Sequence, residues 1–345
     1  LRASLLERAL RPGHGGVRSL RSTAARPGGT VRAMGPILNV VFPIFAIMAA
    51  GYAAGHFRIL GSASSEALNR FVYFIALPAL FFVSMARVSL EEVFNLAFLG
   101  AYGGGAAATF LIAVVVAKFA FPNRLGALGL AGLSAIFSNT GYMGIPLLML
   151  AFGEPGMLPA IISTILNGAV IMAFGIVLLE MDVHQGKSAL VVLKNVLGGV
   201  LRSPLVLSAA GGLLVSGLGL PLPQAITAFC DILGASAGPC ALFAIGLFMV
   251  GKSPTAGMTE VSWLVFLKLL VQPLITWWLA FHYFTMEPVW AAGALIQSAL
   301  PTGALVFVLA QQYDIYVQRS TAAILASTVV SLFTLSALFV WLGIG

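Results

Sequence analysis

Charged residues are scarce in this sequence. Only 8% of its 345 residues are charged, with 11 acidic and 18 basic side chains, whereas a soluble domain carries about 25%. So little charge cannot cover a soluble surface, which excludes a soluble enzyme and a nucleic-acid-binding protein. The net charge of +7 does not change this, because seven arginines and a single acid, Glu7, precede Met34.

Cysteine and histidine are also rare. Cys230 and Cys240 lie in one apolar segment, so neither a disulfide framework nor a cysteine metal site is indicated, and we expect no cofactor and no metal. The sequence has no HExxH motif, no pair of membrane-buried aspartates and no Ser/His dyad inside an apolar segment. An intramembrane enzyme is therefore the less favoured alternative.

Apolar residues dominate instead. They make up 60% of the chain, and the mean hydropathy is +1.02, which predicts an all-α integral membrane protein. A spanning helix needs about 20 mostly apolar residues. The sequence predicts ten spans, near Ile37–Gly55, Glu66–Met85, Phe94–Lys118, Leu125–Phe152, Met157–Glu180, Pro204–Leu220, Ala225–Val250, Val261–Phe284, Val289–Gln311 and Ser320–Trp341.

The chain divides into four parts. Residues 1–33 are rich in Arg and poor in acids; we interpret them as a disordered, spurious extension, with a targeting segment as the alternative. Residues 34–180 and 204–345 form two sets of five spans, joined by a polar linker at 181–203. Each set has an odd number of spans, so a second copy of the first set would be inverted in the membrane. Inverted repeats are typical of secondary transporters.

The basic loop residues set the orientation. Lys and Arg are enriched in cytoplasmic loops, and nine of them fall on one side: Arg58, Arg70, Lys118, Arg124, Lys187, Lys194, Arg202, Lys252 and Arg319. The other side receives only Arg87. This asymmetry predicts a cytoplasmic linker and mature termini outside the cell (inner or plasma) membrane.

The fourth and ninth spans are each interrupted near the middle. Asn139 and Pro146 bracket a glycine-rich stretch in the fourth span, and Pro301 precedes Gly303 in the ninth. Proline removes a helical hydrogen bond, and unwound backbone is tolerated in a membrane only where protein or water surrounds it. If the two breaks cross, their half-helix N-termini direct positive potential at the midplane. The pattern therefore predicts an anion site.

These residues resemble a known family. The run Asn139-Thr140-Gly141-Tyr142-Met143-Gly144-Ile145-Pro146 resembles the fourth-span motif of the auxin efflux carrier family, which includes the plant PIN exporters, and Pro301-Thr302-Gly303 is similar to its ninth-span crossover. The resemblance covers Met34 to Gly345. It implies the bile-acid-symporter or NhaA-like fold, in which helices 4 and 9 cross between a scaffold part and a crossover part. Gly141 and Tyr142 stand where the plant pattern has aliphatic residues, and the linker is short, so the chain looks more like a bacterial-type member.

The resemblance implies a secondary transporter, and an efflux carrier in particular, for a small organic anion such as malate, malonate or an auxin-like acid. By it, Asn139 matches the asparagine that contacts the substrate carboxylate. A gated anion channel is the alternative. The expected substrate-binding residues are Asn139, Thr140, Gly141, Tyr142, Gly144, Pro146, Pro301, Thr302 and Gly303. The expected partners are the substrate and the lipid bilayer, while proton or sodium coupling and a homodimer stay open.

Four polar residues inside the spans are candidates for support or coupling. Asp231 and Lys268 are intramembrane charges that would pair with each other, or else lie singly near the two faces. Asn167 and Gln297 would either line a polar cavity or form interhelical hydrogen bonds. A P-loop-like string begins at Gly246, but it lies inside an apolar span, so we do not expect it to bind ATP.

Overall fold

The computed structural model describes residues 41–88, 95–121, 124–183, 198, 201–251 and 257–344. Every named element within these ranges is helical, which confirms the all-α prediction. The extension at 1–33 and most of the linker at 181–203 lie outside the described residues.

Six helical segments are long and apolar enough to cross a membrane: Ser62–Met85, Leu96–Ala120, Glu154–Leu179, Gln224–Met249, Met258–Tyr283 and Val317–Leu342. Four shorter apolar helices are Phe42–His56, Leu125–Ile136, Thr140–Phe152 and Pro204–Gly217. Each begins and ends within a few residues of an expected span or of one half of it. Large apolar side chains such as Phe119 and Ile232 are 80% and 74% exposed, which is expected where lipid covers the surface. The protein is a multi-pass membrane protein.

Three spans contain a π-helical turn directly before a proline. The turns are Val72–Ala76, Thr140–Gly144 and Leu267–Val271, and the prolines are Pro78, Pro146 and Pro273. Proline cannot donate to the carbonyl four residues earlier and clashes with it. In the wider turn the residue before the proline donates five residues back, as Leu77 does to Val72. The spans therefore continue as helices through these prolines.

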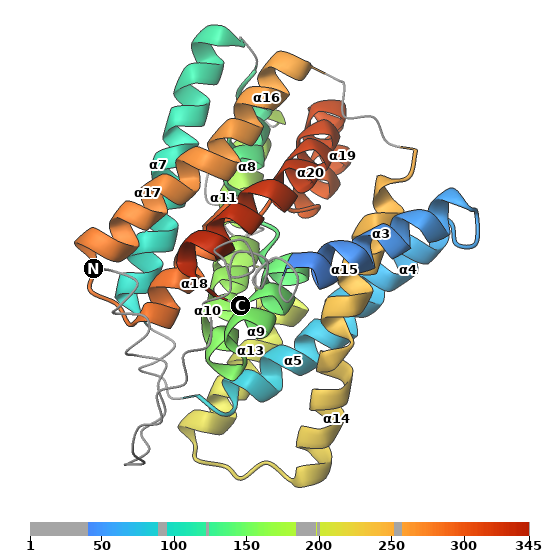
Figure 1. Ribbon diagram of the computed structural model, residues 1–345, viewed down its shortest axis with the longest axis vertical. Helices are drawn as coiled ribbons and strands as arrows, with labels where there is room; N and C mark the ends of the chain where they lie inside the picture. Colours follow the sequence, from blue (N-terminus) through green and yellow to red (C-terminus); the bar gives the residue numbers. More distant parts are fainter. Residues whose placement is uncertain are drawn as a thin grey trace, which may run out of the picture.

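The helices pack as two groups (Figure 1). The first group, called the panel below, consists of α3 (Phe42–His56), α4 (Ser62–Phe71), α5 (Leu77–Met85), α13 (Pro204–Gly217), α14 (Gln224–Ala235) and α15 (Ala237–Met249). The second, called the crossover group, consists of α7 (Leu96–Ala120), α8 (Leu125–Ile136), α9 (Ile145–Phe152), α10 (Met157–Ile165), α11 (Met172–Val183), α16 (Met258–Phe266), α17 (Gln272–Trp278), α18 (Pro288–Ala299), α19 (Leu305–Tyr313) and α20 (Val317–Leu342).

Within the panel, α3 and α15 cross backbone to backbone at two glycines. A Cβ atom on Gly51 would overlap the carbonyl oxygen of Phe243, and one on Gly246 would overlap that of Met48. Gly246 therefore lies inside a packed helix and not in a loop after a strand, as a phosphate-binding motif requires. Lys252 of the P-loop-like string lies outside the described residues.

One apolar core joins the two groups. Leu77 and Phe81 of the panel belong to the same buried cluster as Met143 and Leu147 beside and within α9. A Cβ atom on Gly238 of α15 would lie 3.1 Å from the Cβ atom of Pro146, so α9 packs directly against the panel. The interruption that precedes α9 therefore lies close to the boundary between the groups.

Candidate functional site

The two interrupted spans meet where their helices stop. Ser138 and Thr302 form an antiparallel bridge, the amide of Asn139 donates to the carbonyl of Pro301 at 2.9 Å, and the amide of Gly303 donates to that of Phe137 at 2.8 Å. The end of α8 and the end of α18 therefore lie together, joined by a short extended pairing. This pairing satisfies backbone groups that would otherwise be bare inside the membrane.

Side chains reinforce the crossing from both sides. The Thr302 hydroxyl donates to the carbonyl of Ser134 in α8 at 2.7 Å, and the Thr302 amide donates to the Ser327 hydroxyl of α20 at 3.0 Å. A Cβ atom on Gly303 would lie 3.0 Å from the Phe137 ring, so a larger residue would push the segments apart. Thr302 and Gly303 thus hold the crossing together and are fully buried.

The side chain of Asn139 and two backbone amides that follow it have no hydrogen-bond acceptor among the described residues. The backbone carbonyl of Asn139 accepts from Met143 and Gly144, but its side chain, 9% exposed, forms no hydrogen bond with the described residues. Among the same residues, the amides of Gly141 and Tyr142 have no acceptor either, because they open the helix that leads into α9. A side-chain amide and two helix N-terminal amides are together suited to hold a carboxylate.

Gln297 is the second amide near the crossing. It is fully buried in α18, and within the described part of the chain neither its nitrogen nor its oxygen has a hydrogen-bond partner; the same is true of the Ser138 hydroxyl. Gly144 makes room for it, since a Cβ atom there would overlap the Gln297 amide. A buried amide without partners is uncommon and points to a group that binds something else.

Asn167, in contrast, is fully used. Its side-chain amide donates to the carbonyl of Ser138 at 2.9 Å and to the hydroxyl of Thr140 at 3.2 Å, while its oxygen accepts from Tyr102 at 3.1 Å. Of the two roles considered for Asn167, the structure supports the interhelical hydrogen bond. Thr140 is likewise occupied in holding the crossing.

Neither alternative for Lys268 holds: it does not pair with Asp231, and it does not reach the cytoplasmic face, because its side chain is fully buried. Asp231 instead forms a 2.9 Å ion pair with Arg87, and both side chains are about half exposed. The reason is that α14 packs on α5 inside the panel, and Arg87 follows the C-terminal end of α5. Lys268 is fully buried in the crossover group and donates to Gln272 at 2.7 Å and to the carbonyl of Ser298 at 2.6 Å.

Gly141, Tyr142 and Pro146 face the panel side of the crossing. A Cβ atom on Gly141 would lie 3.2 Å from Thr164 and 3.8 Å from Leu77, so the position has room for little more than glycine. Tyr142 packs at the edge of the shared apolar core. These residues lie where the crossover group meets the panel.

Four polar residues at the crossing were not anticipated: Tyr102, Ser134, Gln272 and Ser327. Gln272 carried a usable signal, because it lies four residues after Lys268 and so on the same helix face. The other three are ordinary residues for a packed span, and only the three-dimensional contacts distinguish them.

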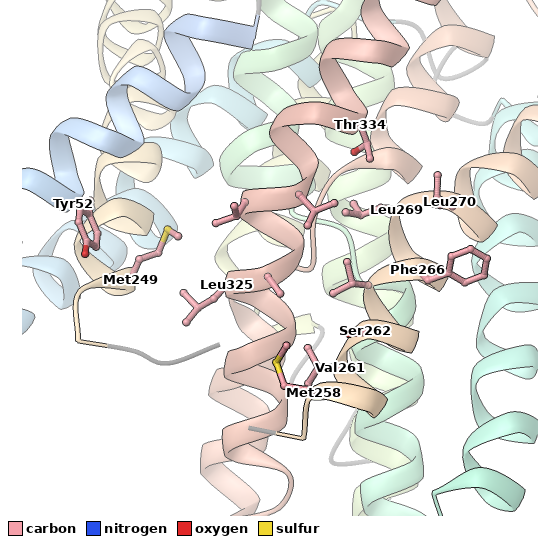
Figure 2. Close-up of a pocket in the computed structure, with 14 residues that line it drawn as sticks. Tyr52, Met249, Met258, Val261, Ser262, Phe266, Leu269, Leu270, Leu325 and Thr334 are labelled. Carbon is pink, nitrogen blue, oxygen red and sulfur yellow. The ribbon is translucent and has the colours of Figure 1, made fainter. Parts of the chain in front are cut away.

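A separate cavity of about 670 Å³ lies along α16 and α20 at the edge of the panel (Figure 2). Tyr52 and Met249 of the panel lie on the side of Leu325 on α20, and Phe266 on α16 lies on the other side of α20. Its lining is almost entirely apolar and includes none of the crossing residues. Because burying an anion without polar partners is costly, this cavity suits a hydrocarbon and not a carboxylate.

The described residues contain no cluster of three or more side chains that could hold a metal ion.

The crossing defines the class of protein. It is a multi-pass membrane protein in which two interrupted helices cross and present donors that have no partner among the described residues. The family model described as "Membrane transport protein" matches residues 36–339. The chain belongs to this family, which is that of the auxin efflux carriers.

Similar proteins come from a bacterium, an archaeon and a mammal. A protein of Rhizobium meliloti named "Putative malonate transporter" is 28% identical over 88% of this chain and 95% of its own length. An "Uncharacterized transporter" of Methanothermobacter thermautotrophicus is 24% identical over 86% of this chain and 95% of its own. The "Lysosomal cholesterol signaling protein" of Mus musculus is 29% identical over 67% of this chain but only 28% of its own length. The family and the first two relatives are named as transporters and not as enzymes.

Proposed function

We propose that this protein is a secondary carrier that exports a small organic anion, a carboxylate such as malonate, malate or an auxin-like acid. The observation that carries the proposal is a set of donors on one short segment that have no acceptor among the described residues, namely the Asn139 side chain and the amides of Gly141 and Tyr142. Donors fixed by a folded backbone stabilise an anion without a titrating group.

We place this site in a ten-span architecture. It consists of two inverted repeats, residues 34–180 and 204–345, joined by a cytoplasmic linker at 181–203. The helical interruptions fall at the fourth and ninth of the ten expected spans, and their segments pair antiparallel. In this arrangement both mature termini lie outside the cell membrane, and the substrate binds near the bilayer midplane, as in other carriers with broken helices.

Transport would use the boundary between the panel and the crossover group. Their shared core at this boundary is apolar, with contacts such as Gly238 on Pro146, so it can rearrange without breaking many hydrogen bonds. The crossing itself is tied by hydrogen bonds within the crossover group, including that of Asn167 to Ser138. We infer that the crossover group moves as a unit and carries the bound anion past the panel.

Malonate is the first substrate to test. The name of the Rhizobium meliloti relative suggests it, and two amides suit a short dicarboxylate: Asn139 would hold one carboxylate and the unpartnered Gln297 the other.

The experiment is counterflow in proteoliposomes loaded with unlabelled malonate and diluted into radiolabelled malonate. A carrier accumulates label transiently and saturates with concentration, whereas a gated channel shows neither behaviour. Asn139→Ala should raise the malonate concentration that gives half-maximal flux. Gln312→Ala, at an exposed amide in α19, should leave this concentration unchanged. Flux without counterflow would favour the channel, and inactivity with a panel of mono- and dicarboxylates would contradict the anion carrier.

A further inference from the structure

Lys268 is the one fully buried basic side chain among the described residues. It lies in the π turn Leu267–Val271 between α16 and α17. In the described part of the chain it forms no ion pair, and its ammonium donates only to neutral oxygens, those of Gln272 and Ser298. The Lys268 Nζ atom lies 2.7 Å from the Gln272 side-chain oxygen and 2.6 Å from the Ser298 carbonyl oxygen.

Lys268 contacts one interrupted helix directly, through Ser298 of α18, and the other through Gln272, which binds α8. Ser298 lies in the last turn of α18, where backbone carbonyls have no partner within the helix. Gln272, held by Lys268 through its side-chain oxygen, uses its nitrogen to donate at 3.2 Å to the carbonyl of Ile136, the last residue of α8. One lysine and the glutamine one turn away thus reach the C-terminal ends of both half-helices.

The C-terminal end of a helix carries partial negative charge and favours a cation. In transporters with broken helices, such half-helix ends and unwound carbonyls are where a coupling Na⁺ is held. Here the side chain of Lys268 occupies this kind of position, beside the carbonyl ends of the two half-helices.

We propose that Lys268 is a built-in counter-cation, which takes the place of a coupling sodium ion and makes the transport cycle independent of sodium. The ammonium is tethered, so it stays with the crossover group through the cycle and is never released. Lys268 acts as a positioning residue: it holds the ends of α8 and α18 and does not itself contact the substrate. The flux measurement that tests this proposal rests on the proposed carrier function.

The test compares the parent protein with Lys268→Met, which keeps the length but removes the charge, and Lys268→Ser, which opens space and adds an oxygen. Lys118→Met, at an exposed lysine in α7, is the matched control. Malonate counterflow is measured in sodium chloride and in N-methylglucamine chloride at equal ionic strength. The thermal unfolding midpoint of each purified protein is measured in the same two salts without substrate.

The parent and Lys118→Met should give equal flux and equal midpoints in both salts. Lys268→Met should lose about tenfold or more of the flux in both, because the carbonyl ends are left without a partner. Lys268→Ser should lose as much without sodium and recover about fivefold with it, because Na⁺ can enter between the introduced hydroxyl and the oxygens of Gln272 and Ser298. The unfolding midpoint of the Lys268→Ser protein should also rise in sodium.

Three results would overturn the proposal: parent flux that falls when sodium is replaced, Lys268→Met flux equal to that of the parent, or a folded Lys268→Ser protein with no sodium response in either measurement. The unfolding measurement needs no substrate. If the parent carries no carboxylate, the proposed function fails, while the sodium response of the Lys268→Ser midpoint still decides whether this is a cation position.

Discussion

The backbone amide of Asn139 donates to the carbonyl oxygen of Pro301 at 2.9 Å, although the two residues come from opposite halves of the sequence. This bond fixes the main chain of Asn139 while its side chain stays without a partner among the described residues. Backbone and side chain therefore have separate tasks at this position. The first holds the crossing, and the second is available for a substrate.

Substitution of Asn139 should affect binding more than folding. Asn139→Ala should weaken carboxylate affinity by about 1–3 kcal/mol, the range for leaving a buried polar partner unsatisfied. Asn139→Asp should be worse, because it places a negative charge against an anion at low dielectric. The substrate concentration at half-maximal counterflow measures the effect of both substitutions. The thermal unfolding midpoint of each variant is the control for folding. An Asn139→Asp protein that carries a carboxylate as well as the parent would contradict the anion site.

Gly144 and Gly168 form a matched pair of glycines in π-helical turns. A Cβ atom on Gly144 would overlap the buried Gln297 amide, while nothing lies within 4 Å of one on Gly168. Gly144→Ala should lower stability by about 1–3 kcal/mol through overpacking and reduce transport as Gln297 is displaced. Gly168→Ala should be neutral or slightly stabilising. Equal unfolding midpoints for the two variants would show that Gln297 moves aside freely.

Much of the fold could be predicted from the sequence because its causes are local. Composition and apolar length specify the expected spans, and Pro301 marks the interruption in the expected ninth span, since a proline acts on its own few residues. In the expected fourth span the helix continues through Pro146, and the interruption lies earlier, at Ser138 and Asn139. The fourth-span motif also brought Asn139 and Gly144 into the candidate site. Their roles in binding stay predictions.

The partners of the intramembrane charges could not be predicted in this way. Asp231 and Lys268 lie on consecutive spans, which favoured a pair, but α14 packs in the panel and Lys268 lies in the crossover group. Which helices become neighbours depends on the whole packing, and no local pattern encodes it. For the same reason, only the structure shows that the Gln297 amide lacks a hydrogen-bond partner among the described residues.

The Arg87–Asp231 ion pair should contribute little to stability. Both side chains are about half exposed, and pairs of this kind contribute about 0.2–1 kcal/mol. Asp231→Asn should therefore lower the free energy of unfolding by less than about 1 kcal/mol. In combination with Lys268→Met its effect should be additive, because the two residues share no partner in the described part of the chain. A large coupling energy in this double-mutant cycle would restore the rejected pair.

Topology can be checked with reporter fusions. Arg124 at the start of α8 pairs with Asp182 near the end of α11 at 3.4 Å, which places these two ends on one face, and Arg319 pairs with Glu260 at 2.7 Å near the starts of α20 and α16. Reporters placed after Arg124, within residues 181–203 and after Lys252 should all report cytoplasm. An external signal from the central linker would contradict the inverted repeat.

Pro301 tests whether the interruption of the ninth span is needed for movement. Pro301→Ala supplies the missing amide hydrogen and removes the ring, so α18 can extend toward the carbonyl of Gln297. That extension would turn the Pro301 carbonyl away from Asn139 and loosen the crossing. We expect normal membrane insertion but a turnover rate reduced by about fivefold or more, since loss of such a hydrogen bond inside the protein costs about 1–3 kcal/mol.

Pro288→Ala is the matched control for this substitution. Pro288 opens the same helix at its first turn, where a missing amide hydrogen costs nothing, so the variant should transport at the parental rate. The comparison uses initial counterflow rates at saturating substrate, normalised to inserted protein. If Pro301→Ala and Pro288→Ala turned over malonate equally fast, the interruption would not be required, and the transport mechanism would have to rely on motions elsewhere in the crossover group.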